Sequence, residues 1–274
     1  MNLIEGSKEI IERAIKEQDP YAVVLLLSGG TDSTTALNVT NELGIKINFI
    51  LHGVTGTGIK ETHDFVKATA ARWPVKYIEA NAGTAYVDYV LRKGFFGRGK
   101  DAHTFSYHML KSGPFRKAVS KYIRQGKKNR PVLLINGARR MESDNRRKTM
   151  VDPIKKSEGN VWVNIINEWP DHACADYLEG NSIDINPVSK LICRSGECNC
   201  GTMLTPGDRI EIGYHFPVWL KWLDDLRAEV KKRGFPWDWA DPVPKAWTLE
   251  KNGQLNMFQP MCSSCVINYG KTTK

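Results

Sequence analysis

Residues 28–33, Ser-Gly-Gly-Thr-Asp-Ser, combine small size with groups that bind phosphate. They follow an apolar run and precede a stretch with helical spacing, so they lie at a helix start, where the backbone amides and the helix dipole favour an anion. Glycines let the backbone approach a ligand closely, and a carboxylate suits Mg²⁺. The pattern predicts a phosphate loop with Asp32 and Ser33 as catalytic residues; an ordinary capped turn is the alternative. The phosphate-binding residues we expect are Ser28, Gly29, Gly30, Thr31, Asp32 and Ser33.

Two other glycine-rich stretches resemble nucleotide loops. Residues 94–101 nearly match the Walker A pattern, but Asp101 stands where a Ser or Thr would bind Mg²⁺ and no apolar strand precedes them, which excludes that loop. Residues 53–60 follow an apolar run, at the edge where parallel sheets bind ligands. We therefore interpret them as a candidate wall for an adenosine group and place His52 among the nucleotide contacts.

Four arginines follow the apolar run at residues 131–136. They are Arg139, Arg140, Arg146 and Arg147. Guanidinium groups on a strand-to-helix loop can converge on phosphate or sulfate with bidentate geometry. We expect Arg139 and Arg140 to contact the nucleotide, with Arg139 also catalytic, and Arg146 and Arg147 to bind substrate. Solvated arginines beside a capped helix are the alternative.

Five of the six cysteines fall in two clusters. One has the spacing Cys193-x4-Cys198-x-Cys200, and the other is Cys262-x2-Cys265. Two such clusters can supply four thiolates to one metal centre, and their spacing does not separate Zn²⁺ from an iron–sulfur cluster. The expected ligands are Cys198, Cys200, Cys262 and Cys265, with Cys193 as a substitute ligand or a sulfur-relay nucleophile. Buried thiols without metal are the alternative, and the remaining cysteine, Cys174, is interpreted as an ordinary thiol.

Positive charge is concentrated in the middle of the chain. The net charge is +9, yet residues 92–156 hold 19 Lys and Arg against 4 Asp and Glu, which leaves −6 for the remainder. Such a segment favours a polyanionic ligand, either a nucleotide or a nucleic acid. A solvated basic face is the alternative.

The composition excludes several classes of protein. The 274 residues are 41% hydrophobic and 25% charged, too apolar for a mainly disordered chain. No apolar run reaches the ~18 residues of a membrane helix, and the charged amphipathic start lacks the apolar core of a leader peptide. Six cysteines in this length do not indicate a disulfide scaffold. We expect a cytoplasmic protein without a membrane partner, with a homodimer as one possible assembly.

The elements that must position these residues alternate between strands and helices. Continuous apolar runs predict buried parallel strands at 22–27, 45–51, 75–80, 131–136 and 161–166. Helical spacing predicts helices at 33–43, 59–72, 84–92, 105–125 (broken near 113–114), 172–178 and 216–233. Residues 187–203 and 234–247 are expected to be irregular. The fold class is therefore α/β, a parallel sheet with helices on both faces over residues 1–167, followed by a cysteine-containing extension over residues 168–274.

The phosphate loop resembles the SGGxDS loop of the PP-loop ATP pyrophosphatases. Residues 137–147, Gly-x-Arg-x-x-Glu-Ser-x-x-Arg with one further Arg, resemble a segment of the phosphoadenosine phosphosulfate (PAPS) reductase branch, which implies that Gly137 also contacts the nucleotide. Residues 95–111 lie where that branch carries basic residues toward substrate. The resemblance therefore implies that Lys100, His103 and Lys111 bind substrate. Residues 186–188 and 195–201 resemble a cysteine-bearing segment of its phage and bacterial members. The resemblance covers roughly residues 20–205.

This resemblance implies an adenine nucleotide α-hydrolase-like fold, similar to that of the DNA phosphorothioation sulfurtransferases. It implies binding of ATP with Mg²⁺, cleavage at the α-phosphate, release of pyrophosphate and adenylation of an acceptor, for sulfur transfer involving a sulfur-carrier protein. It also favours a 4Fe-4S cluster over Zn²⁺. The C-terminal Glu-Cys-Gly-(Leu/Ile)-His segment of assimilatory PAPS reductases is missing, and the phosphate loop is complete, so ATP cleavage is favoured over PAPS reduction. The alternatives are a PAPS reductase with an external thiol donor and a zinc-containing nucleic-acid-binding protein with an inactive loop.

Overall fold

The sheet has six strands in the order β3-β2-β1-β4-β6-β5. The computed structural model describes residues 2–126, 130–157, 159–170, 172–245 and 247. Five strands are parallel, and β5 runs antiparallel to β6 at one edge. The strands are β1 (Ala22–Leu26), β2 (Phe49–Val54), β3 (Lys76–Asn81), β4 (Val132–Asn136), β5 (Ile154–Ser157) and β6 (Asn160–Asn164). Because the chain runs outward from β1 in both directions, the carboxyl ends of β1 and β4 flank a topological switch point, where open α/β sheets bind ligands.

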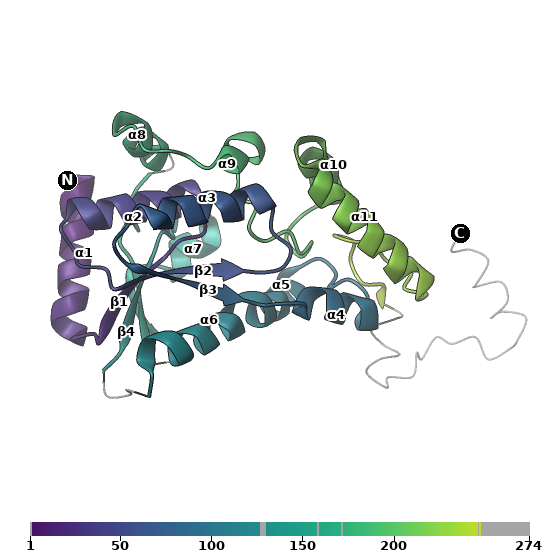
Figure 1. Ribbon diagram of the computed structural model, residues 1–274, viewed down its shortest axis with the longest axis horizontal. Helices are drawn as coiled ribbons and strands as arrows, with labels where there is room; N and C mark the ends of the chain where they lie inside the picture. Colours follow the sequence, from purple (N-terminus) through teal and green to yellow (C-terminus); the bar gives the residue numbers. More distant parts are fainter. Residues whose placement is uncertain (1, 127–129, 158, 171, 246, 248–274) are drawn as a thin grey trace, which may run out of the picture.

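Helices cover both faces of the sheet (Figure 1), as predicted. Alternate residues of β1 face opposite ways: Val23 and Leu25 pack with α1 (Leu3–Gln18), α2 (Thr31–Glu42) and α3 (Lys60–Ala71), whereas Val24 packs against α6 (Gly113–Ala118) and the π-helical turn that follows it. All five residues of β1 are buried, which explains the continuous apolar run. The α/β fold class with its mostly parallel sheet is confirmed.

The helical segments begin and end as follows. They are α1 (Leu3–Gln18), α2 (Thr31–Glu42), α3 (Lys60–Ala71), α4 (Ala85–Lys93), α5 (Lys100–Tyr107), η1 (His108–Ser112), α6 (Gly113–Ala118), η2 (Val119–Arg124), η3 (Arg140–Glu142), α7 (Asp144–Thr149), α8 (Ala173–Gly180), α9 (Pro187–Ile192), α10 (Pro206–His215) and α11 (Pro217–Lys232). Among them, η1 and η2 are π-helical and η3 is a 3-10 turn.

Helical structure continues from α5 to η2, so the predicted break near residues 113–114 was wrong. The Gly113 amide donates to the His108 carbonyl, five residues back, which widens the turn just before Pro114. Pro114 then occupies the first turn of α6. The wider π-type turn before it interrupts the regular hydrogen-bond pattern at the point where the proline lacks a donor.

Three other predictions differ from the structure. β2 begins at Phe49 rather than at residue 45. The edge strand β5, with the sequence Ile-Lys-Lys-Ser, was missed because it has no apolar run. Helices α9 and α10 lie in or beside the segment expected to be irregular, and each has a proline in its first turn with an Asn or Thr N-cap before it.

Helices α10 and α11 lie beyond the carboxyl ends of β2 and β3 (Figure 1), whereas α8 and α9 contact α2 and α3. A separate apolar cluster joins Tyr86 and Val90 of α4 with Leu223 of α11 and with Trp237 and Trp239. Trp237 and Trp239 are therefore core residues. The domain boundary at residues 167/168 stays a prediction. Among the described residues, no helix is long and apolar enough to span a membrane.

Candidate functional site

The phosphate loop, residues 28–33, forms the turn between β1 and α2. Gly29 has a left-handed φ of +79°, and a Cβ there would lie 2.8 Å from Val66 Cγ2, so glycine is required. Ser28 Oγ lies 3.0 Å from Ser33 Oγ, and the Ser33 hydroxyl donates to the Gly30 carbonyl oxygen over 3.0 Å. These bonds close the loop at the start of α2, where the first amides lack partners within the helix.

Arg139 reaches the phosphate loop from the carboxyl end of β4. Its Nε lies 3.1 Å from Asp32 Oδ1, and the side chains are 9% and 24% exposed, respectively. Gly137 makes this approach possible, because a Cβ there would lie 2.6 Å from the carbonyl carbon and oxygen of Asp32 and 2.7 Å from the amide nitrogen of Ser33. The structure thus brings together Asp32, Ser33, Gly137 and Arg139, which the sequence placed in separate motifs.

Arg146 also lies close to this pair. Burial lowers the pKa of its guanidinium; Asp32 acts in the opposite direction, and the neighbouring Arg139 adds to the lowering. Arg146 forms an ion pair with Glu142 one turn before it. A half-buried guanidinium beside a second one is suited to an anionic ligand.

Arg140 and Arg147 are engaged at the surface. Arg140 Nε donates to the Arg147 carbonyl oxygen over 3.1 Å, and Arg140 Nη1 lies 3.5 Å from Glu168 Oε1. Arg147 Nη1 lies 3.6 Å from Asp144 Oδ1. The structure therefore separates the four predicted arginines into an inner pair, Arg139 and Arg146, and an outer pair.

His52 is completely buried at the carboxyl end of β2. Its Nδ1 lies 2.7 Å from the Leu27 carbonyl oxygen, and its Nε2 lies 3.2 Å from Glu197 Oε2. Glu197 Oε1 accepts the Thr55 amide over 3.0 Å. His52 thus links the strand before the phosphate loop to Glu197, and both of its ring nitrogens face protein groups.

The cysteine segment, residues 193–200, lies against residues 53–60. The backbone amide of Asn199 donates to Thr57 Oγ1 over 3.0 Å, and Trp219 Nε1 donates to the Thr57 carbonyl oxygen over 3.1 Å. Gly58 is needed because a Cβ there would lie 2.8 Å from the Glu197 carbonyl oxygen. The cysteine segment therefore packs against residues 53–60, the candidate adenosine wall.

Asn186 connects the two regions. Its buried Nδ2 donates to the Gly29 carbonyl oxygen over 2.9 Å, to Thr62 Oγ1 over 3.1 Å and to the Ser195 carbonyl oxygen over 3.4 Å. Its Oδ1 accepts the Val188 amide and caps α9. The sequence analysis did not single out Asn186 or Glu197 as site residues, because only the cap signal of an Asn before a Pro is visible locally.

Cys198 and Cys200 lie side by side, with 3.8 Å between their sulfur atoms. Cys200 is 6% exposed, and its Sγ lies 3.4 Å from Thr202 Oγ1. Hydrogen-bond donation from Cys198 lowers the pKa of the Cys200 thiol, against the effect of burial and with help from Thr202 and Ser106. The same donation, together with burial, raises the pKa of the Cys198 thiol.

The predicted basic residues lie on the neighbouring helix. Lys100 begins α5 and is exposed. His103 Nδ1 lies 3.3 Å from Thr202 Oγ1, and Lys111 is close enough to Cys198 to lower the pKa of that thiol. His103 and Lys111 therefore lie near the cysteine pair, whereas no contact in the described part of the chain joins Lys100 to it.

The remaining predicted metal ligands do not complete a centre in the described part of the chain. Cys193 is exposed at the end of α9, and Cys262 and Cys265 lie outside the described residues. Among the described residues, no group of three His, Cys, Asp or Glu side chains could hold a metal ion. A zinc or iron–sulfur centre needs three or four protein ligands, so the donor set described here does not fit one.

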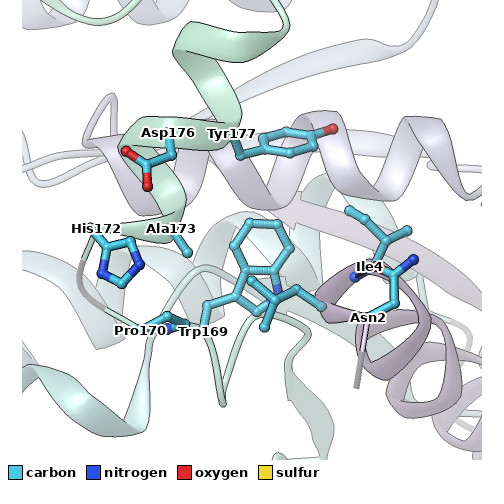
Figure 2. Close-up of a pocket in the computed structure, with 9 residues that line it drawn as sticks. Asn2, Ile4, Trp169, Pro170, His172, Ala173, Asp176 and Tyr177 are labelled. Carbon is cyan, nitrogen blue, oxygen red and sulfur yellow. Dashed lines mark hydrogen bonds between the residues drawn. The ribbon is translucent and has the colours of Figure 1, made fainter.

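One cavity lies away from these residues. It has a volume of about 350 Å³ and is formed where the start of α1 meets α8, with the Trp169 indole at its centre and Tyr177 above it (Figure 2). The Trp169 Nε1 donates to Ser7 Oγ over 3.1 Å. The cavity contains none of the residues predicted for the site.

Comparison with known proteins identifies the family. Residues 22–200 match the model of the phosphoadenosine phosphosulfate reductase domain. The chain belongs to this family. The match to the PAPS reductase domain begins at β1 and ends at Cys200, so it includes the phosphate loop, the four arginines and the cysteine pair. The resemblance drawn from residues 28–33 and 137–147 is confirmed.

The chain is similar to several solved structures at low sequence identity. The PAPS reductase of Candida auris, a phosphate complex, is 14% identical, with 68% of this chain and 84% of that chain covered and a TM-score of 0.48. FMN adenylyltransferase of Candida glabrata with FMN and the ATP analog AMPCPP is 9% identical, with 99% and 82% covered and a TM-score of 0.50. The U34-tRNA thiolase NcsA of Methanococcus maripaludis with its [4Fe-4S] cluster is 12% identical, with 94% and 91% covered and a TM-score of 0.41. No curated protein matches the sequence.

Proposed function

We propose that this member of the PAPS reductase domain family binds ATP with Mg²⁺ at the carboxyl edge of the sheet and adenylates an acceptor. The observation that carries the proposal is the Asp32–Arg139 contact of 3.1 Å at the start of α2. It puts a cation and a carboxylate on a glycine-rich turn at the switch point between β1 and β4. Amides at a helix start and a guanidinium together suit a pyrophosphate group.

The reaction needs no protein nucleophile. An acceptor oxygen attacks the α-phosphorus, the bond to the bridging oxygen breaks, and pyrophosphate leaves with the electron pair. The amides of Thr31, Asp32 and Ser33 would bind the phosphates, and Arg139 and Arg146 would neutralise charge that develops on the leaving group. Arg140 and Arg147 lie at the surface, outside the inner pair of arginines, and would help to bind the nucleotide and the substrate there.

Asp32 is suited to bind a Mg²⁺ ion whose other ligands come mainly from the substrate phosphates. Mg²⁺ is commonly held by one or two carboxylates, with waters and phosphate oxygens as the other ligands. Asp32 supplies one partly exposed carboxylate, and its Oδ1 is already paired with Arg139. The ion would neutralise phosphate charge, while Asp32 orients Arg139 as well.

We further propose that the adenylated acceptor then receives sulfur. Adenylation turns the acceptor oxygen into a good leaving group, and a sulfur donor can then displace AMP. The contacts of the cysteine segment with residues 53–60 support this role, because they hold Cys198 and Cys200 beside the proposed nucleotide wall. The basic residues of α5 and η1 would face a nucleic acid or a sulfur-carrier protein.

Pyrophosphate release tests the adenylation step. With the full chain, ATP and candidate acceptors, Asp32→Ala should abolish release and leave the circular dichroism spectrum unchanged, since Asp32 lies in the first turn of α2 and alanine suits a helix. Asp225→Ala removes another helical, ion-paired aspartate on α11 and should have no effect. Unchanged release by a folded Asp32→Ala protein would overturn the proposal.

The arginine fork gives a second test. Arg139→Lys keeps the charge but loses the planar group, so ATP should bind about 10- to 100-fold more weakly, on the order of 1–3 kcal/mol for a charge-assisted bond. Arg72→Lys, which alters an exposed ion pair with Asp184, is the matched control. Equal ATP affinity of Arg139→Lys and the wild type would make Arg139 a structural residue only.

PAPS reduction with an external thiol donor is the second candidate, and the family match favours it. It would use the same residues around Asp32 and Arg139 without pyrophosphate release. Sulfite formation from PAPS and a thiol, with no pyrophosphate released from ATP plus acceptors, would select this candidate.

A further inference from the structure

The cysteine pair has a geometry that the proposed adenylation does not use. We propose that Cys198 and Cys200 form a redox-active dithiol that reduces an external disulfide, either of a small thiol or of a protein. The activity needs no nucleotide, so its failure and the failure of the adenylation proposal are separate outcomes.

The distance between the two sulfur atoms supports the proposal. They are 3.8 Å apart, and the Cys198 thiol donates to Cys200. A disulfide bond is about 2.05 Å long, so the sulfur atoms need to approach by roughly 2 Å. The pair is therefore set up for a bond within one short segment.

The backbone around the pair is held firmly. Between the cysteines, the amide of Asn199 donates to Thr57 Oγ1 over 3.0 Å, and its carbonyl oxygen accepts Trp239 Nε1 over 3.0 Å. The Cys200 carbonyl oxygen accepts the Tyr86 hydroxyl over 3.3 Å. These bonds come from the loop after β2, from α4 and from the segment after α11, so they keep the thiols adjacent.

The two thiols differ in access and surroundings. Cys200 is 6% exposed, with the Thr202 and Ser106 hydroxyls at 3.4 and 3.8 Å from its Sγ, whereas Cys198 is the more exposed of the two. An external disulfide therefore meets Cys198 first. Cys200, behind it, is placed to attack the Cys198 sulfur.

The chemistry balances with an external disulfide, RSSR, as oxidant. Cys198 Sγ bonds to one sulfur of RSSR, the S–S bond breaks, and the departing RS⁻ takes the proton of Cys198 as RSH. Cys200 Sγ then bonds to Cys198 Sγ, and the second RS⁻ leaves with the proton of Cys200. The dithiol loses two electrons and two protons, and RSSR becomes two RSH.

Thiol mapping of the full chain tests the proposal. Reduced protein is equilibrated over a range of reduced to oxidised glutathione ratios, quenched with N-ethylmaleimide, and mapped by mass spectrometry with and without a chelator. We expect a reversible Cys198–Cys200 disulfide in the wild type. The exposed Cys193 of the same segment is mapped in the same samples as an internal reference.

Cys200→Ser separates a redox pair from two packed thiols. Without the resolving thiol, glutathione should accumulate on Cys198 at least tenfold above the wild type. Three results would overturn the proposal: both thiols alkylated at every ratio, a disulfide from either of them to Cys262 or Cys265, or resistance to both reagents until the chelator removes a stoichiometric metal. The wild-type titration decides the question even if the variant does not fold.

Discussion

The phosphate loop and the cysteine segment lie at the same edge of the sheet but are held there in different ways. The phosphate loop is closed by bonds within residues 28–34, such as Ser28 with Ser33. The cysteine segment is held from far along the chain: Glu197 meets Thr55, and Asn199 meets Thr57, each across 142 positions. One region is therefore a local motif and the other a tertiary assembly.

The difference predicts how each region responds to change. A local turn survives the loss of one distant contact because its own strand and helix still define it. A segment without regular structure depends on the distant bonds that satisfy its buried polar groups. We therefore expect the largest effects where the tertiary contacts of the cysteine segment are removed.

Glu197→Ala should give the largest loss of stability. It leaves His52 Nε2 and the Thr55 amide buried without their carboxylate partner, and each buried polar group left without a partner costs about 1–3 kcal/mol. Urea unfolding measures the loss. Glu197→Gln keeps the shape and an acceptor for Thr55 and should lose less; an equal loss in both variants, or none in Glu197→Ala, would contradict the assignment of the contact.

Asn186→Ala should come next and should affect both regions. It removes the bonds to Gly29 and Ser195 and the cap of α9, for which we expect about 2 kcal/mol of lost stability. ATP affinity should fall as well, because Gly29 belongs to the phosphate loop. Asn181→Ala, an exposed asparagine after α8, is the control. A stability loss with unchanged ATP affinity would show that the phosphate loop holds itself.

Gly137→Ala should cost about 1–3 kcal/mol, as overpacking does. The new Cβ would meet the Asp32 carbonyl group at 2.6 Å, so the arginine-bearing loop must move away from the phosphate loop. ATP binding, followed by calorimetry, should weaken more than stability does. Gly180→Ala is the matched control, since a Cβ there meets nothing within 4 Å. ATP binding equal to that of the wild type would separate Gly137 from the site.

The smallest expected effect is a difference in alkylation rate between Cys174 and the exposed Cys193, with no change in stability or ATP binding. Burial, with Asp32 nearby, raises the pKa of this thiol to about 12. A raised thiol pKa keeps the neutral, unreactive form up to that pH, so Cys174 should resist alkylation at pH 7–9 in the folded protein. Peptide mapping after iodoacetamide treatment measures this, with the exposed Cys193 as the internal reference. Equal labelling of both thiols would contradict a buried Cys174.

The strands that position the site were predictable because each is a short apolar run between turn signals. β1, β3, β4 and β6 lie within a residue or two of the predicted ranges. The edge strand β5 and the helix through Pro114 were not predictable in this way. Polar edge residues carry no burial signal, and a π-turn depends on how the whole helix packs.

The sequence by itself determined the tight turn at residues 28–33, since two glycines between an apolar run and a stretch with helical spacing predict a turn from β1 into α2. Only the tertiary structure decided that Arg139 and Arg146, rather than Arg140 and Arg147, lie near Asp32. It also decided that His52 meets Glu197. The physical reason is range: turn chemistry acts between neighbours, whereas ion pairs and buried polar contacts join residues whose meeting depends on how the sheet is ordered.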